Sequence, residues 1–99
     1  MAARPIWVIA HLSARPDRIE EVRESLTNLI EPTRAEDGCI RYELTQNNND
    51  PTDFTFVEEW TDDESLDRHL ESAHIRDLQS RAGELFGAPP DIRRYTLLA

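Results

Sequence analysis

The second half of the chain carries a histidine placed where it could take part in proton transfer. His69 follows Leu66 by three residues and directly precedes Leu70, so on a helix it would lie on the apolar stripe and point toward the core. An imidazole there could be a purely structural group, buried and hydrogen-bonded. It could equally be a general base, because a pKa near neutrality suits proton abstraction inside a small cavity.

A carboxylate and several aromatic rings are expected close to this histidine. Glu58 alternates with polar positions along a strand-like segment, on the same face as Phe56 and Trp60. A carboxylate among aromatic rings needs a partner, and His69 is a candidate, unless Glu58 reaches water at the open end of the strand. Trp60 and Tyr42 could either fill the core or form the wall of a pocket for an aromatic ligand.

The histidine spacing bears on metal binding. His69 and His74 are five residues apart, which places them about 140° from each other on one continuous helix. They could converge only if the helix breaks near Ser72, and with Glu58 they could then imitate a two-histidine, one-carboxylate iron site. Because the usual i, i+4 spacing is missing, we expect no metal. Cys39 has no base nearby in sequence and is interpreted as an inert thiol.

Composition and charge argue against several classes of protein. The 99 residues suffice for one compact domain over residues 1–99. The formal net charge of −9 would repel a phosphate backbone, so no nucleic-acid ligand is expected. A single cysteine forms no disulfide within the chain, and the early apolar run at 6–10 is too short to span a bilayer. We therefore expect a cytoplasmic protein without a membrane segment.

Residue periodicity predicts the elements that position these side chains. Strands are expected at 6–12, 39–46, 54–60 and 91–98, where apolar, β-branched and aromatic residues cluster or alternate. Helical spacing predicts a first helix from residue 17 that Pro32 should interrupt. A capping box at 61–64 should start a second helix, and Ser72 should start a third. The polar run at 47–53 reads as a hairpin loop.

This order of elements predicts an α+β fold of the ferredoxin-like type, a four-stranded antiparallel sheet with helices on one face. The first strand is apolar on both of its faces, with Trp7 and Ile9 on the side that no helix covers. Val57, Tyr95 and Leu97 add to that side. An exposed apolar sheet of this kind usually marks an interface, so a homodimer is expected.

Several spaced motifs together are similar to one known family. They are Gly38-Cys39-x2-Tyr42, the turn Asp50-Pro51-x2-Phe54, Arg15-Pro16 after the first strand, and the string Glu58-x-Trp60-x5-Leu66-x2-His69-Leu70-x3-His74. Over essentially the whole chain, the sequence resembles the antibiotic biosynthesis monooxygenase (ABM) domain family, closest to its quinol monooxygenase-like branch. The resemblance implies a dimeric α+β barrel, in which each subunit keeps a pocket between its own sheet and helices.

The resemblance also implies roles for individual residues. His69 and Glu58 would be the catalytic pair, with His69 as the base and Glu58 orienting it. Substrate contacts would come from aromatic side chains and a second histidine, namely Trp60, Phe56, Tyr42 and His74. In the heme-degrading branch an Asn and a His serve the heme, but those places align with Ala10 and Gln79 here, so no heme and no other cofactor is expected.

The function implied is a cofactor-independent monooxygenase that acts on a quinol or hydroxyaromatic small molecule and molecular oxygen. In such chemistry the enzyme deprotonates the substrate hydroxyl, and the resulting anion reduces O₂ in a pocket that excludes water. Two alternatives remain open. One is an isomerase or lyase that uses the same pocket without O₂, and the other is a non-catalytic dimer that binds a small ligand.

Overall fold

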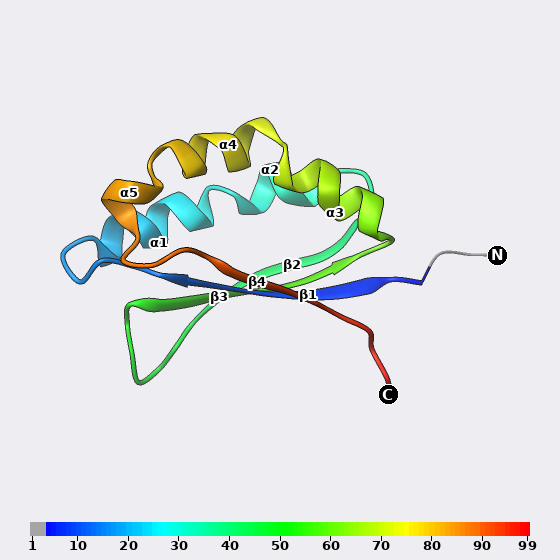
Figure 1. Cartoon of the computed structure of the whole chain (residues 1–99), viewed down its shortest axis with the longest axis horizontal. Helices are drawn as coiled ribbons and strands as arrows, with labels where there is room; N and C mark the ends of the chain where they lie inside the picture. Colours follow the sequence, from blue (N-terminus) through cyan, green and yellow to red (C-terminus); the bar gives the residue numbers. More distant parts are fainter. Residues whose placement is uncertain (1–3) are drawn as a thin grey trace.

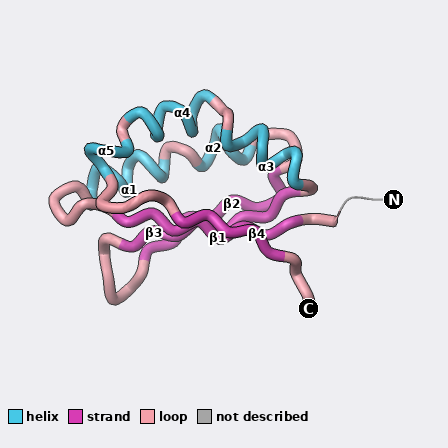
Figure 2. Tube along the Cα trace, in the orientation of Figure 1, coloured by secondary structure: helices cyan, strands magenta, loops and turns pink. Residues whose placement is uncertain are grey.

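The computed structural model describes residues 4–99 and contains one antiparallel sheet with all helices packed on one of its faces (Figure 1). The strand order across the sheet is β2-β3-β1-β4. The strands are β1 (Ile6–Ser13), β2 (Cys39–Gln46), β3 (Asp53–Trp60) and β4 (Asp91–Tyr95). The helices are α1 (Ile19–Thr27), α2 (Ile30–Arg34), α3 (Asp63–Leu70), α4 (Ala73–Ser80) and α5 (Ala82–Leu85). The predicted ferredoxin-like α+β fold is confirmed, and Figure 2 shows its two layers.

The register of the sheet places Glu58 in the middle of the buried face. On β3, alternate residues are buried toward the helices. Glu58 lies opposite Val8 of β1 on one side and opposite Tyr42 of β2 on the other. A strand with period 2 therefore carries this carboxylate into the layer between sheet and helices, together with Phe56 and Trp60.

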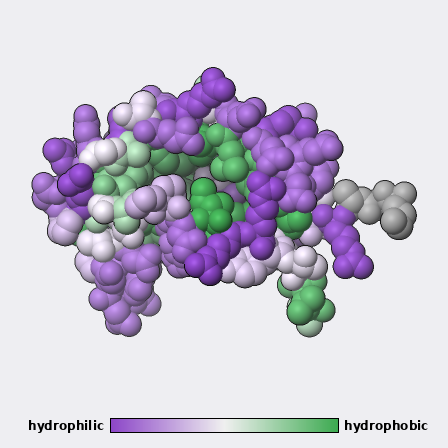
Figure 3. All heavy atoms as spheres, in the orientation of Figure 1, coloured by the Kyte–Doolittle hydropathy of each residue, from purple (hydrophilic) through white to green (hydrophobic). Residues whose placement is uncertain are grey.

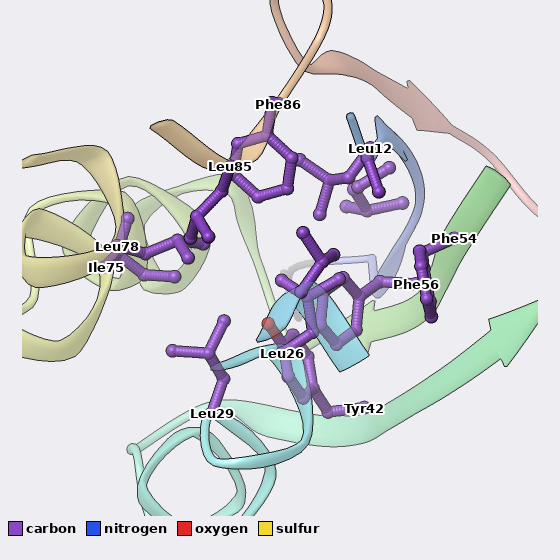
Figure 4. Close-up of a cluster of buried hydrophobic side chains, with 14 of the residues drawn as sticks. Leu12, Leu26, Leu29, Tyr42, Phe54, Phe56, Ile75, Leu78, Leu85 and Phe86 are labelled. Atoms are coloured by element: carbon purple, nitrogen blue, oxygen red, sulfur yellow. The ribbon is translucent and has the colours of Figure 1, made fainter. Parts of the chain in front are cut away.

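The core fills the space between the sheet and the helices. Its members converge from both layers, as Figure 4 shows for the labelled side chains. The helices contribute Val22, Leu26, Leu66, Ile75 and Leu78, and the turn between α1 and α2 contributes Leu29. The sheet contributes Val8, Ala10, Leu12, Tyr42, Phe54, Phe56 and Trp60. This packing fixes the helices over the sheet and so determines which polar side chains are trapped between them.

The first helical segment is interrupted ahead of Pro32, as predicted. α1 ends at Thr27 and α2 begins at Ile30. Pro32 has no N–H to donate to the carbonyl of Asn28, so a continuous helix would lose that hydrogen bond. In the structure, Pro32 instead falls in the first turn of α2, where backbone N–H groups have no helical partner.

The later helical segment is also interrupted, and this break positions the histidines. α3 ends at Leu70, and Ser72 starts α4 by accepting a hydrogen bond from the Ile75 backbone N–H at 3.4 Å, as predicted. The capping box expected at 61–64 is wrong by one residue. The N-cap of α3 is Asp62, whose carboxylate accepts the Ser65 N–H at 2.8 Å. An acidic side chain is also favoured here by the helix dipole.

In the part of the chain that the structure describes, no helix covers the opposite face of the sheet (Figure 1). Trp7, Ile9 and Val57 are only partly buried there, and Tyr95 remains 47% exposed. β4 ends at Tyr95 rather than at the predicted residue 98, because the partner strand β1 begins at Ile6 and offers little further pairing. Among the described residues, no helix is both long and apolar enough to cross a membrane.

Candidate functional site

A small cavity lies between the sheet and helices α3 and α4. Its volume is about 80 Å³. In Figure 3, apolar side chains line a hollow between the helical layer and the edge of the sheet. Four of the predicted site residues line the cavity, namely Tyr42, Phe56, Glu58 and His69. Since a cavity of about 150 Å³ accommodates benzene, an aromatic substrate would require this one to widen.

Ala10 and Gln79 also line the cavity, whereas Trp60 and His74 are not among its lining residues. Trp60 packs instead against the ring of His69, with the ring centroids 4.8 Å apart. His69 also meets Tyr42 edge-on, with the ring centroids 5.5 Å apart. The indole therefore packs against the histidine and supports it, and it does not line the cavity as we expected.

Glu58 is buried and bonded to Trp60. The indole Nε1–H of Trp60 donates to Glu58 Oε1 at 2.8 Å, so the partner of this carboxylate is Trp60 and not His69, the partner we expected. The two residues share one face of β3, which makes the bond a local one. The pKa of Glu58 is raised to about 7, chiefly by burial and in part by the charge of Glu36, while the Trp60 hydrogen bond opposes both.

The partner of His69 is Glu36, a residue that sequence reasoning missed. His69 Nδ1 lies 2.7 Å from Glu36 Oε2, and the His69 side chain is only 3% exposed. An ionised carboxylate can only accept, so this contact assigns the proton of the neutral ring to Nδ1 and leaves a lone pair on Nε2. Burial lowers the pKa of His69, while Glu36 partly opposes that effect. In the neutral ring, Nε2 is therefore the nitrogen with a lone pair that can accept a proton.

His74 joins the same carboxylate. Its Nε2 lies 2.9 Å from Glu36 Oε2, and its ring centroid is 5.9 Å from that of His69. The two histidines converge because the chain breaks between α3 and α4, so the spacing argument against a shared site does not hold here. The carboxylate in the group is Glu36, however, and not Glu58.

A tight turn carries Glu36 to this position. Gly38 has a φ of +89°, a conformation that side chains other than glycine rarely adopt. Any Cβ at Gly38 would collide with the side chain of Ser65 at the start of α3. The Gly38 carbonyl also accepts the Thr61 N–H at 2.9 Å, which ties the turn to the end of β3. The Asp37-Gly38 pair was the only sequence signal of this close approach.

Replacing Glu58 by glutamine should make the protein more stable at alkaline pH. Burial raises the folded-state pKa of Glu58 from an ordinary 4.5 to about 7, so the folded protein holds a proton that the unfolded chain releases. This contribution to stability is complete below about pH 4.5 and is lost as the pH rises through about 7. The unfolding free energy of Glu58→Gln relative to wild type should therefore increase by roughly 2–3 kcal/mol between pH 5 and pH 8.

Denaturant unfolding of both proteins at the two pH values measures this difference. Glutamine keeps a carbonyl oxygen that can accept the Trp60 hydrogen bond, so only the charge is removed. Glu59→Gln is the matched control, because the neighbouring Glu59 lies on the opposite face of β3. A difference independent of pH, or one equally large in the control, would show that Glu58 does not titrate in this range.

Comparison with known proteins places the chain in a family. Residues 5–81 match the family described as antibiotic biosynthesis monooxygenase. The protein named "Putative monooxygenase Rv0793" of Mycobacterium tuberculosis is 36% identical over 86% of this chain and 83% of its own length. "Uncharacterized protein sll1783" of Synechocystis is 29% identical over 94% of this chain, which spans only 63% of that protein.

A solved structure resembles the fold over its full extent. PA3566 from Pseudomonas aeruginosa superposes with a TM-score of 0.93 at 31% sequence identity, covering 100% of this chain and 99% of the other. The match in sequence and the match in structure point the same way. This chain belongs to the antibiotic biosynthesis monooxygenase family.

Proposed function

We propose that this protein is a monooxygenase of a quinol or hydroxyaromatic small molecule and that it uses no cofactor. One observation carries the proposal. His69 is held through Nδ1 by Glu36 and lines a largely apolar cavity together with Tyr42 and Phe56. A base in an apolar enclosure is what such a reaction requires of the protein, because the substrate anion itself supplies the electrons.

The reaction assigns a role to each group. His69 Nε2 takes the proton of the substrate hydroxyl, and Glu36 stabilises the imidazolium that forms. The substrate anion reduces O₂, one oxygen atom becomes bonded to the substrate carbon and the other leaves as water. All four electrons come from the substrate, so no external reductant is needed. Tyr42 and Phe56, stacked with ring centroids 4.6 Å apart, would form one wall for the substrate ring.

The cavity must open to admit a substrate ring, and it could open at the edge of the sheet. Pro90 and Ile92 line the cavity at the edge strand β4, and Ile92 is 42% exposed. Movement of this edge would enlarge the cavity without disturbing the bonds of His69 or Glu58. We propose that the substrate enters beside β4.

Oxygen uptake with a panel of quinols and polycyclic phenols tests the proposed function. The expected result is substrate-dependent oxygen uptake that persists after the protein is treated with a chelator. The absorption spectrum of the active protein should show no Soret band. With ¹⁸O₂, the product should carry one labelled oxygen atom. Turnover of a panel member under anaerobic conditions would instead support an isomerase or lyase, and binding without turnover would support a non-catalytic role.

We also propose that the uncovered face of the sheet pairs two copies of the chain. Trp7, Ile9 and Val57 line this face and Tyr95 adds an exposed ring, while Leu97 is 61% exposed just beyond it. Obligate interfaces of this kind bury roughly 2,000 Å² or more in total. The double variant Trp7→Glu with Ile9→Lys should therefore be monomeric or aggregated, because each copy would bury unpaired charges.

Sedimentation velocity at micromolar concentration measures the change. Arg76→Glu with Glu71→Lys introduces the same two residue types at exposed positions of the helical layer and should leave the dimer unchanged. A monomeric wild-type protein would refute the dimer.

A further inference from the structure

We propose that Glu36, His69 and His74 form a binding site for one divalent transition-metal ion, with Zn²⁺ as the best-suited ion. We further propose that the bound ion switches off His69 as a base. The second statement rests on the proposed function, whereas the first does not.

The three side chains come from three separate places and meet at one point. Glu36 precedes β2, His69 lies near the end of α3 and His74 lies in the first turn of α4. Their ligand atoms are His69 Nδ1, His74 Nε2 and a carboxylate oxygen of Glu36, all within 4.8 Å of one another. Both ring nitrogens lie within 3 Å of the same oxygen, at 2.7 and 2.9 Å, so both rings point at a common position.

This donor set suits zinc. Two histidines and one glutamate are the protein ligands of several zinc sites that keep a fourth position open for water. Tetrahedral bonds of about 2.0–2.2 Å hold neighbouring ligand atoms roughly 3.3 Å apart. The Glu36 oxygen would therefore have to withdraw by about half an ångström, and the two histidine nitrogens, within 4.8 Å of each other, would have to draw closer together. Room for that movement exists on the solvent side, where the Glu36 side chain is 18% exposed and that of His74 is 21% exposed. The same exposure gives the ion an entry path.

Occupation of the site would reverse the roles of the two nitrogens of His69. Without the ion, a neutral His69 ring that donates to the Glu36 carboxylate holds its proton on Nδ1 and its lone pair on Nε2. With the ion on Nδ1, the proton of the neutral ring must lie on Nε2. The nitrogen assigned to take the substrate proton would then already hold one. Zinc would thus inhibit without unfolding the protein or filling the cavity, because His74 and Glu36 do not line it.

Isothermal titration calorimetry of chelator-treated protein with Zn²⁺ tests binding in the absence of any substrate. The Cys39→Ser background removes the one thiol that could bind zinc elsewhere. One ion per chain is expected, and Mg²⁺, which prefers oxygen ligands, should not bind. His74→Gln should weaken zinc binding by at least about 100-fold. His11→Gln is the matched control, since exposed His11 also faces a carboxylate, that of Asp53 at 3.5 Å, and its loss should change nothing.

Histidine ring ¹⁵N NMR and oxygen uptake test the effect of the ion. On adding Zn²⁺, the proton of His69 should move from Nδ1 to Nε2, and oxygen uptake should fall with the same midpoint as binding. In His74→Gln, the residual oxygen uptake should resist that zinc concentration.

Absence of zinc binding in the Cys39→Ser protein, or an equal loss of zinc affinity in His11→Gln, would refute the proposed site. Binding with an unchanged proton position on His69 would overturn the switch. A protein that binds zinc but consumes no oxygen with any substrate would refute the proposed function and leave the site intact.

Discussion

Replacing His69 by glutamine is expected to lower substrate-dependent oxygen uptake by about 10²–10⁴-fold while the protein stays folded. Loss of a positioned general base typically costs this much in rate. A glutamine amide can still donate to Glu36 in place of Nδ1–H, and it fills much of the same volume between Trp60 and Tyr42. It has no nitrogen lone pair to replace Nε2. His69→Ala should be equally inactive, and it also leaves a void and removes one of the two histidine contacts of Glu36.

The two variants together separate a catalytic histidine from a structural one. Melting temperature and oxygen uptake are measured on both, with rates divided by the folded fraction. If His69 is only structural, the alanine variant loses stability, whereas the glutamine variant keeps activity in proportion to its folded fraction. Full activity of the glutamine variant would remove His69 from the reaction.

The fold could be predicted because its signals are local and repeated. The alternation of Phe54, Phe56, Glu58 and Trp60 fixes which face of β3 is buried, and two apolar faces on β1 mark a central strand. The interruptions at Pro32 and Ser72 follow from backbone chemistry that acts within a few residues. The end of β4 was misplaced because strand length depends on the partner strand, which a local pattern does not show.

The site could be predicted only in part, for the same reason. That His69 and Glu58 are buried near each other follows from their periodic faces, and both line the cavity. The hydrogen-bond partners of these two side chains do not follow from the sequence pattern. Glu58 found a partner two residues away on its own strand, whereas the partner of His69 lies 33 residues earlier in sequence. Glu36 lies in a run of charged residues that reads as solvated surface, and only the turn at Gly38 brings it inside.

Because Glu36 bonds His69, a substitution of Glu36 is also expected to have a large effect on catalysis. Replacing Glu36 by glutamine should lower kcat by roughly 10²–10⁴-fold, comparable with the loss of an orienting carboxylate in other histidine-dependent enzymes. Two consequences add up. The imidazolium formed when His69 takes a proton loses its compensating charge. A glutamine NH₂ can also donate to Nδ1, which moves the ring proton to Nε2 and leaves no base there.

Steady-state kinetics of Glu36→Gln, with Glu31→Gln as the matched control on the exposed side of α2, measures this effect. Because Glu36 does not line the cavity, KM should change by no more than a few-fold while kcat falls. A merely structural role would instead lower the amount of folded enzyme and leave kcat per folded chain unchanged. A rise in KM at constant kcat would mean that Glu36 shapes the substrate pocket and that His69 does not depend on it for its tautomer.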